Sequence, residues 1–249
     1  MVENQIVLLS AVAATFIVAG FVKGVTGMGL PTVAMGALGA LISPLTAAGL
    51  LIVPSFVTNV WQLLAGPRTG AVLKRLWPMM LAILVGTIAG SSLLTEGNTA
   101  VTTAALGAAL VAYACHTLFA RQLRVPAHME PWLSPTVGLV TGVVTGGTGV
   151  FVIPAVPYLQ ALGLEKDDLI QSLGLSFTVS TIALAAGLAL RGAYEQGNLW
   201  LSALALVPAL IGMWIGQLAR NRISPPAFRR WFLVALLILG TEMLLRPIL

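Results

Sequence analysis

The sequence Gly20-Phe-Val-Lys-Gly-Val-Thr-Gly-Met-Gly-Leu-Pro-Thr-Val-Ala-Met35 decides how this chain is interpreted. It places a lysine, four glycines and a proline in an otherwise long apolar run. Glycine and proline weaken or end a helix, so we predict that a helix breaks here. The stretch Gly138-Leu-Val-Thr-Gly-Val-Val-Thr-Gly-Gly-Thr-Gly-Val-Phe-Val-Ile-Pro154 has the same character. We predict that the two breaks form one site.

The composition around these stretches indicates a polytopic membrane protein. Of the 249 residues, 58% are hydrophobic and only 8% are charged, whereas about 25% are charged in soluble domains. The net charge of +5 fits an excess of Lys and Arg in loops on one side of a membrane. We therefore expect a lipid bilayer and no nucleic acid as partner. The single Cys115 offers neither a disulfide nor a metal cluster, and no metal or cofactor is expected.

Apolar runs predict five helical segments in each half of an all-α chain. Each half has a long helix, a glycine break, a short segment and three long helices, which indicates an internal repeat with boundaries 1–122 and 123–249 inside one transmembrane domain. Gly86-x-x-x-Gly90 and Gly212-x-x-x-Gly216 recur at the same place in both halves. The predicted segments are 6–24, 30–43, 45–65, 73–94, 99–119, 132–148, 149–162, 168–190, 198–218 and 228–246.

Five segments per half is an odd number, so the two repeats are inverted if every segment crosses the membrane. With both termini outside, ten of the 13 basic residues fall in inside loops, as the positive-inside rule requires. Arg191 and Arg246 are outside, and Lys23 lies near the first break. The inside residues are Arg68, Lys74, Arg75, Arg121, Arg124, Lys166, Arg220, Arg222, Arg229 and Arg230.

A glycine-rich break at membrane depth must have its backbone groups satisfied by protein or by a water-filled cavity. The helix starts that follow such breaks point free N–H groups at anions, and glycine lets a ligand approach the backbone. Threonine hydroxyls at the second break add donors. The breaks therefore predict substrate-binding residues Gly24, Thr26, Gly27 and Gly29 in the first copy, and Thr141, Thr145, Gly146, Gly147, Thr148 and Gly149 in the second.

Lys23 is the only basic residue that we place within a span. A charge at membrane depth costs about 2.5–3.5 kcal/mol on insertion scales, so Lys23 either lines a pathway or snorkels to the headgroups. No acidic residue in a span offers it a partner, which favours an anionic ligand or snorkelling over a buried salt bridge. We match Lys23 to Thr141 in the second copy, so the site is predicted to be asymmetric in charge.

Polar residues follow one face of segment 45–65, at Ser55, Thr58, Asn59 and Gln62. Either they line the cavity or they bond neighbouring helices. Asn59 and Gln62 are the preferred binding residues, because a buried amide is costly to place. Segment 168–190 offers a corresponding set, from which Ser176 is chosen; the others are Gln171, Ser172, Thr178 and Ser180.

Nearly the whole chain resembles the sulfite exporter (TauE/SafE) family of membrane transporters. In that family each half carries a Gly-x-Gly-Gly-Gly motif followed by a proline. Gly146, Gly147, Gly149 and Pro154 match the second copy, with Thr148 at a glycine position. The first copy has Gly27-Met28-Gly29, with Pro31 early. The resemblance implies transport of small sulfur-containing or organic anions such as sulfite, thiosulfate or sulfonates.

We therefore predict a secondary transporter, in the export direction, of a small anion across the bacterial inner membrane. The two breaks are expected to meet near the midplane, with alternating access by rocking of the halves. Coupling to protons or to the membrane potential stays open. The alternatives are an intramembrane enzyme, for which the spans lack a nucleophile with a base, and a membrane partner protein that transports nothing.

Overall fold

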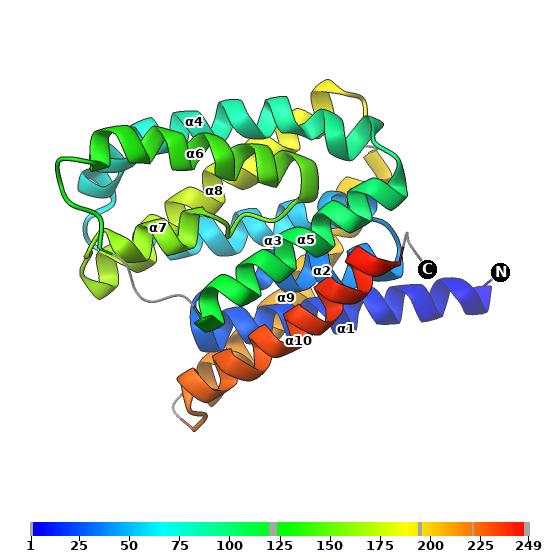
Figure 1. The fold of residues 1–249 in the computed structure, drawn as a ribbon. Helices are drawn as coiled ribbons and strands as arrows, with labels where there is room; N and C mark the ends of the chain where they lie inside the picture. The colour runs from blue at the N-terminus through cyan, green and yellow to red at the C-terminus, as the bar shows by residue number, and fades with distance from the viewer. Residues whose placement is uncertain (1, 120–123, 194–195, 221, 247–249) are drawn as a thin grey trace.

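The computed structural model describes residues 2–119, 124–193, 196–220 and 222–246, and every regular element within them is a helix (Figure 1). Six of these helices are long and apolar enough to cross a membrane, which confirms an all-α polytopic membrane protein. The helices are α1 (Val2–Thr26), α2 (Leu30–Leu41), α3 (Pro44–Leu64), α4 (Thr69–Glu96), α5 (Thr99–Phe119), α6 (Glu130–Thr148), α7 (Ala155–Ala161), α8 (Lys166–Leu190), α9 (Gln196–Ala219) and α10 (Pro225–Leu245).

The first predicted break is confirmed. Helix α1 ends at Thr26 because Gly27 and Gly29 take left-handed backbone angles, with φ of 78° and 101°. Side chains with a Cβ atom rarely adopt this conformation, so glycine fits here. Helix α2 then starts at Leu30, with Pro31 in its first turn, where a missing N–H costs nothing.

The predicted helix over 149–162 is wrong in its first part. Helix α6 ends at Thr148 and is followed by the left-handed Gly149, whose φ is 70°, but residues 150–153 are not helical and α7 covers only Ala155–Ala161. Pro154 explains the late start, because proline disfavours helical angles at the residue before it and has no N–H to donate. The second break is therefore followed by a short non-helical segment and not directly by a helix start.

Glycine-lined helix faces bring α1 against α9 and α6 against α4. A Cβ atom added to Gly212 would lie 2.0 Å from the carbonyl oxygen of Ile17, and one added to Gly86 would lie 2.5 Å from that of Leu139. Such contacts leave no room for a side chain. The two recurring Gly-x-x-x-Gly pairs are thus the surfaces on which the backbones of these helices pack.

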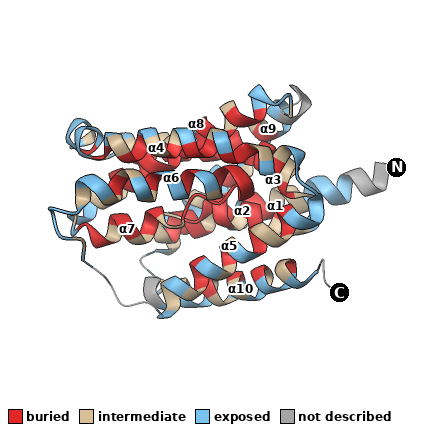
Figure 2. Ribbon diagram, turned by 45° about the horizontal axis from the view of Figure 1, so that its top comes forward, coloured by how far each residue is buried: buried red, intermediate tan, exposed pale blue. Residues whose placement is uncertain are grey.

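Helices α3 and α8 pack against each other, and α3 also contacts α9 while α8 contacts α4. Buried residues gather where the helices face one another, and exposed residues lie on the outside and at the ends (Figure 2). Helices α5 and α10 form a further pair along one side of the bundle. The middle of the protein is therefore built around α3 and α8, which carry the polar residues that the sequence singles out.

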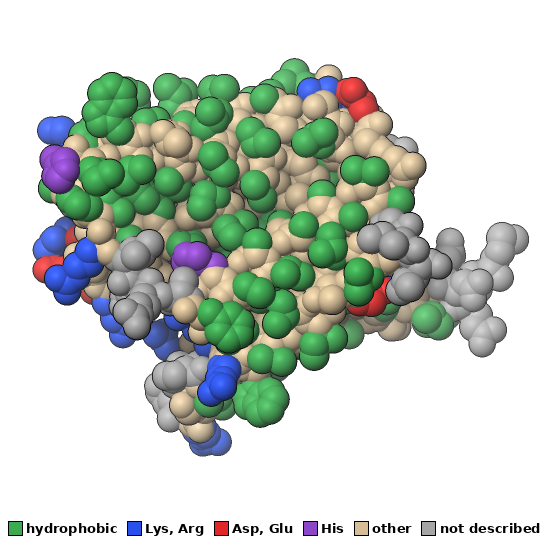
Figure 3. Space-filling model, viewed as in Figure 1, with side chains coloured by type: hydrophobic (Ala, Val, Ile, Leu, Met, Phe, Trp, Pro, Cys, Tyr) green, Lys and Arg blue, Asp and Glu red, His purple; other side chains and the backbone are tan. Residues whose placement is uncertain are grey.

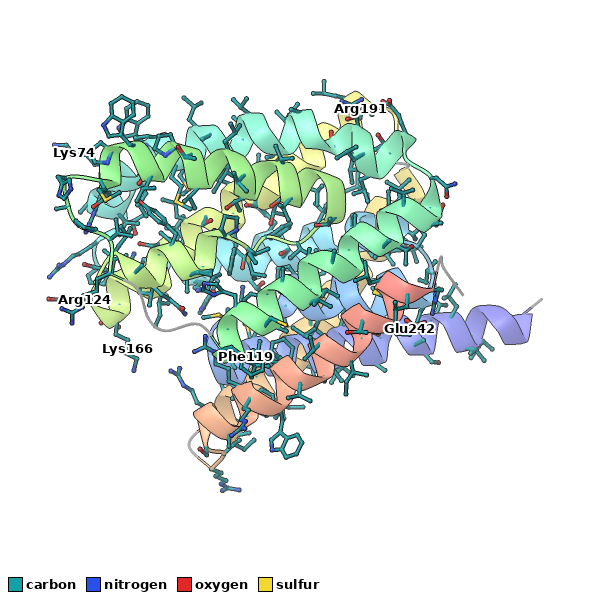
Figure 4. The ribbon with its side chains drawn as sticks, viewed as in Figure 1. Lys74, Phe119, Arg124, Lys166, Arg191 and Glu242 are labelled. Carbon is teal, nitrogen blue, oxygen red and sulfur yellow. The ribbon has the colours of Figure 1, made fainter. Side chains whose placement is uncertain are left out.

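Charged side chains lie at the two ends of the bundle, with a hydrophobic surface between them (Figure 3). Lys74, Arg124 and Lys166 lie at one end, whereas Arg191 and Glu242 lie toward the end at which both termini emerge (Figure 4). This distribution is typical of a protein that sits across a bilayer. Arg121, which the sequence assigns to an inside loop, is outside the described residues.

Candidate functional site

Lys23 lies inside the bundle and not at its surface. Its side chain belongs to the last turn of α1, is only 4% exposed, and donates a hydrogen bond from Nζ to Oδ1 of Asn59 on α3. Asn59 in turn donates from Nδ2 to Oγ of Ser55, at 3.2 Å. The snorkelling interpretation is therefore wrong, and two residues that were predicted independently lie in contact.

The partner of Lys23 is neutral. Within the described part of the chain, each recorded ion pair involves an arginine near one end of the bundle, as with Arg75 and Glu130, and none includes Lys23. A buried cation without a counter-charge is costly, because an amide dipole replaces only part of its hydration. This position therefore favours a ligand that brings a negative charge.

Both breaks are closed by a threonine in the same way. Thr26 Oγ1 donates to the carbonyl of Val22, at 2.9 Å, or of Met28, at 2.7 Å, and accepts from the N–H of Met28, at 3.3 Å. Thr148 Oγ1 donates to the carbonyl of Val144, at 2.6 Å, and accepts from the N–H of Val150, at 3.2 Å. These hydroxyls satisfy backbone groups, as buried breaks require. Their role is thus to hold the breaks.

The shared geometry fixes which residues of the two copies correspond. Gly27 donates its N–H to the carbonyl of Lys23 at 2.8 Å, and Gly149 donates its N–H to the carbonyl of Thr145 at 2.7 Å. Thr145 is therefore the counterpart of Lys23, and the predicted match to Thr141 is wrong by one helical turn. The error arises because the glycine spacing can be aligned in more than one way, whereas the hydrogen bonds of Thr26 and Thr148 align the breaks in only one. The asymmetry in charge remains.

Several predicted binding residues pack against other helices. Cβ atoms added to Gly24 and Gly146 would lie 2.3 Å from carbonyl oxygens of Met213 and Thr87, so both glycines face a neighbouring backbone. Gly147 faces the side chain of Leu93, 3.3 Å from such an atom. The structure thus gives these three glycines a packing role.

Three other predicted residues make contacts within the bundle. Gln62 donates from Nε2 to the carbonyl of Ile170, at 3.0 Å, and so ties α3 to the start of α8. Gly29 would place a Cβ atom 3.0 Å from the side chain of Val22. Thr145 is fully buried and donates to the carbonyl of Val150, at 3.2 Å.

The two breaks are offset from each other along the bundle. In Figure 1, α6 ends toward the side on which the termini emerge, and α1 ends toward the other side. That the breaks meet near the midplane stays a prediction. They are connected through Met35 of α2, since a Cβ atom added to Gly149 would lie 2.7 Å from the Met35 side chain.

Five buried hydroxyls have no hydrogen-bond partner among the described residues: Thr32, Thr87, Thr141, Ser176 and Ser180. Unsatisfied buried polar groups are costly and mark sites for water or a ligand. Thr141 and Ser176 were predicted as binding residues. Thr32 and Thr87 were not, because an isolated threonine in an apolar helix has no distinguishing pattern.

Ser176 and Ser180 on α8 lie at nearly the same level along the bundle axis as Asn59 and Ser55 on α3. Gly174 of α8 packs against the backbone of Gln62 and Leu63, and Gly66 packs against Gln171, so α3 and α8 run antiparallel. With equal rise along both helices, Ser176 comes near the height of Asn59, and Ser180 near that of Ser55. The middle of the bundle thus holds an ammonium group, an amide and free hydroxyls at similar depth.

A bundle of membrane-spanning helices with two glycine breaks and a buried cation next to the first of them has the architecture of a membrane transporter with broken helices. A family model, Sulfite exporter TauE/SafE, matches residues 12–243. The chain belongs to this family. A search of the curated proteins and a search of the solved structures gave no significant match.

Proposed function

We propose that the protein exports a small anion, such as sulfite, thiosulfate or an organosulfonate, across the bacterial inner membrane. Membership of the sulfite exporter family supports this substrate class. The anion binds at Lys23, with Asn59 holding the ammonium group in place and Ser176 supplying a hydroxyl donor. In this assignment Lys23, Asn59 and Ser176 bind the anion, as the sequence predicts, whereas the glycines of the breaks allow helices to turn and pack and do not contact the ligand.

The observation that carries the proposal is the neutral environment of Lys23. The lysine is buried, its recorded side-chain partner is an amide oxygen, and the recorded ion pairs lie elsewhere. A monovalent anion at the ammonium group would neutralise the charge and restore lost hydrogen bonds. Free hydroxyls at similar height suit the oxygen atoms of a sulfur oxyanion.

The helix pairing supports two inverted repeats with boundaries 1–122 and 123–249. Helix α1 of the first half packs on α9 of the second, and α6 of the second packs on α4 of the first, in each case through glycines. The first helix of each half thus packs on the fourth helix of the other half, as a two-fold relation between the halves requires. Breaks that are offset in opposite directions along the bundle fit a two-fold axis in the membrane plane.

The charge distribution supports a topology with both termini outside. Lys74, Arg124 and Lys166 gather at the end away from the termini (Figure 4), and basic residues favour the cytoplasmic side. Export against a gradient needs an energy source. We propose that a proton gradient is this source. The alternative source is the membrane potential, and a transport assay can distinguish the two.

Thermal stabilisation of the purified protein tests the binding site. A saturating anion present at 100 times its Kd stabilises a folded protein by about 2.7 kcal/mol. We expect sulfite or a sulfonate to raise the melting temperature of the wild type and of the control variant Lys74→Met, whose lysine is exposed at the end of the bundle. Lys23→Met should remove the rise. A rise that persists in Lys23→Met would overturn the site.

Transport into proteoliposomes tests the function itself. We expect uptake of labelled sulfite or sulfonate to depend on Lys23 and to respond to an imposed pH gradient at zero membrane potential. A response to the potential alone would exclude proton coupling. If no anion of this class moves in vesicles that contain the stable wild-type protein, the proposed substrate class is wrong.

A further inference from the structure

A cavity of about 820 Å³ lies at the end of the bundle where α1 and α5 end and α10 begins. Arg220, Arg229 and Arg230 contribute to its wall, together with the hydroxyl-bearing residues Tyr113 and Thr117. Lys23 does not line it, whereas Thr26 and Met28 of the first break do. The cavity therefore opens beside the first break and does not include the lysine at which we propose that the transported anion binds.

The three arginines of this cavity are not used in ion pairs among the described residues. Other arginines of the chain have carboxylate partners, such as Glu130 for Arg75 and Glu96 for Arg191. The recorded pairs include none of the cavity arginines. Guanidinium groups bind phosphate and carboxylate through paired N–H donors. Three of them around one cavity therefore call for an anionic ligand.

Apart from Thr26, the remainder of the wall is apolar. Val25, Leu118, Phe119, Phe232, Leu233 and Val234 line it. Cavities of roughly 300–1,000 Å³ hold ligands of drug size, so an inorganic oxyanion would leave most of this wall uncovered. A ligand that fits both parts of the wall has an anionic group and a long apolar body.

The height of the cavity matches the headgroup region of a bilayer. Trp231 follows directly after Arg230 and is 75% exposed, and Phe119 at the end of α5 is 78% exposed (Figure 4). Exposed tryptophan is enriched where membrane meets water. Basic pockets between helices at this level bind anionic lipid headgroups.

We propose that this cavity binds an anionic phospholipid, with its phosphate at Arg220, Arg229 and Arg230 and its acyl chains against Phe119 and Phe232. This assignment does not depend on which anion the protein transports. Each basic residue near the membrane surface contributes about fivefold to the affinity for anionic lipid, so the three together should contribute on the order of a hundredfold.

Native mass spectrometry of the detergent-purified protein tests the assignment with added phosphatidylglycerol or phosphatidylcholine. We expect the wild type to retain phosphatidylglycerol selectively. The variant Arg220→Gln/Arg229→Gln/Arg230→Gln should bind it on the order of a hundredfold more weakly. The matched control Lys74→Gln/Lys166→Gln/Arg222→Gln removes three exposed charges that do not line the cavity and should bind as the wild type does.

Three outcomes would overturn the lipid assignment. They are equal retention of the two lipids by the wild type, equal weakening in both triple variants, and displacement of phosphatidylglycerol by millimolar inorganic phosphate or sulfite. The last would assign the cavity to a free anion. If the triple variant does not fold, the single substitutions at the three arginines should each weaken binding about fivefold, and unchanged binding in all three would be equally decisive.

Discussion

The ammonium group of Lys23 on α1 donates a hydrogen bond to the side-chain oxygen of Asn59 on α3. This contact supplies a dipole where a buried cation would ordinarily have a carboxylate. Substitutions at Asn59 should therefore change stability and anion binding in opposite ways, depending on whether the new side chain brings a charge.

Asn59→Asp places a carboxylate beside Lys23. We expect a protein at least as stable as the wild type without ligand, because the ammonium group gains a counter-charge. Its thermal stabilisation by sulfite or a sulfonate should be lost, since the carboxylate occupies the place of the anion. Asn59→Leu is the comparison. Its free energy of unfolding should fall by about 1–3 kcal/mol, because the ammonium group loses its buried partner, and its melting temperature should still rise with anions. An undiminished response in Asn59→Asp would contradict the site.

The threonine caps predict an equal effect at both breaks. Thr26→Val and Thr148→Val each remove a hydroxyl that bonds backbone groups at a break. Each should lower the free energy of unfolding by about 0.5–1.5 kcal/mol, as measured by thermal melting in detergent. Thr→Ser at the same positions retains the hydroxyl and should restore most of the loss. Failure of serine to do so would indicate that the methyl group and not the hydrogen bond matters.

Gly27 and Gly149, a left-handed glycine from each break, should respond differently to alanine. At Gly27 a Cβ atom would meet nothing within 4 Å, so Gly27→Ala costs only backbone strain, about 1–2 kcal/mol. At Gly149 it would also lie 2.7 Å from Met35. Gly149→Ala should therefore destabilise more, and the added substitution Met35→Ala should recover part of that extra cost. A double-mutant cycle on melting temperatures checks this coupling.

The glycine-lined helix pairs predict a steric effect. Gly86→Ala and Gly212→Ala force a Cβ atom against a neighbouring backbone, at 2.5 Å and 2.0 Å. Each should destabilise the protein by about 1–3 kcal/mol. Gly70→Ala is the control, because Gly70 lies in open space in α4 and alanine favours a helix by up to about 1 kcal/mol. Equal melting temperatures for all three variants would rule out close packing of these helices.

Cysteine labelling tests the topology. In a Cys115→Ser background, Ala100→Cys lies at the end of the bundle near the start of α5, and Lys74→Cys lies at the other end. We expect a membrane-impermeant maleimide to label the first variant in intact cells and the second only after the membrane is opened. The reverse pattern would place both termini in the cytoplasm.

The helices were largely predictable from the sequence, because apolar length and glycine breaks are local signals. The break after Thr26 and the end of α6 at Gly149 follow from backbone angles that glycine alone adopts easily. The non-helical segment before α7 was missed, since the effect of Pro154 on its predecessor competes with an apolar run that resembles a helix. The local preference of proline decided the outcome at that point.

The candidate site was predictable only in part. Lys23 and Asn59 stand out because each is costly to bury, and the structure joins them. Gly24 and Gly146 were assigned to ligand binding, but a glycine that admits a ligand and a glycine that admits a neighbouring helix look the same in a sequence. Their partners lie on α9 and α4, far along the chain. No local pattern carries that information.

The packing of α1 on α9 has a consequence for the order in which the protein is made. The ribosome releases α1 first, whereas the surface that covers Gly20 and Gly24 belongs to a helix near the end of the chain. Until α9 enters the membrane, the glycine face of α1 must be sheltered by lipid, by the insertion machinery or by temporary neighbours. Final packing of α1, the helix that carries Lys23, therefore waits for synthesis of the last quarter of the polypeptide.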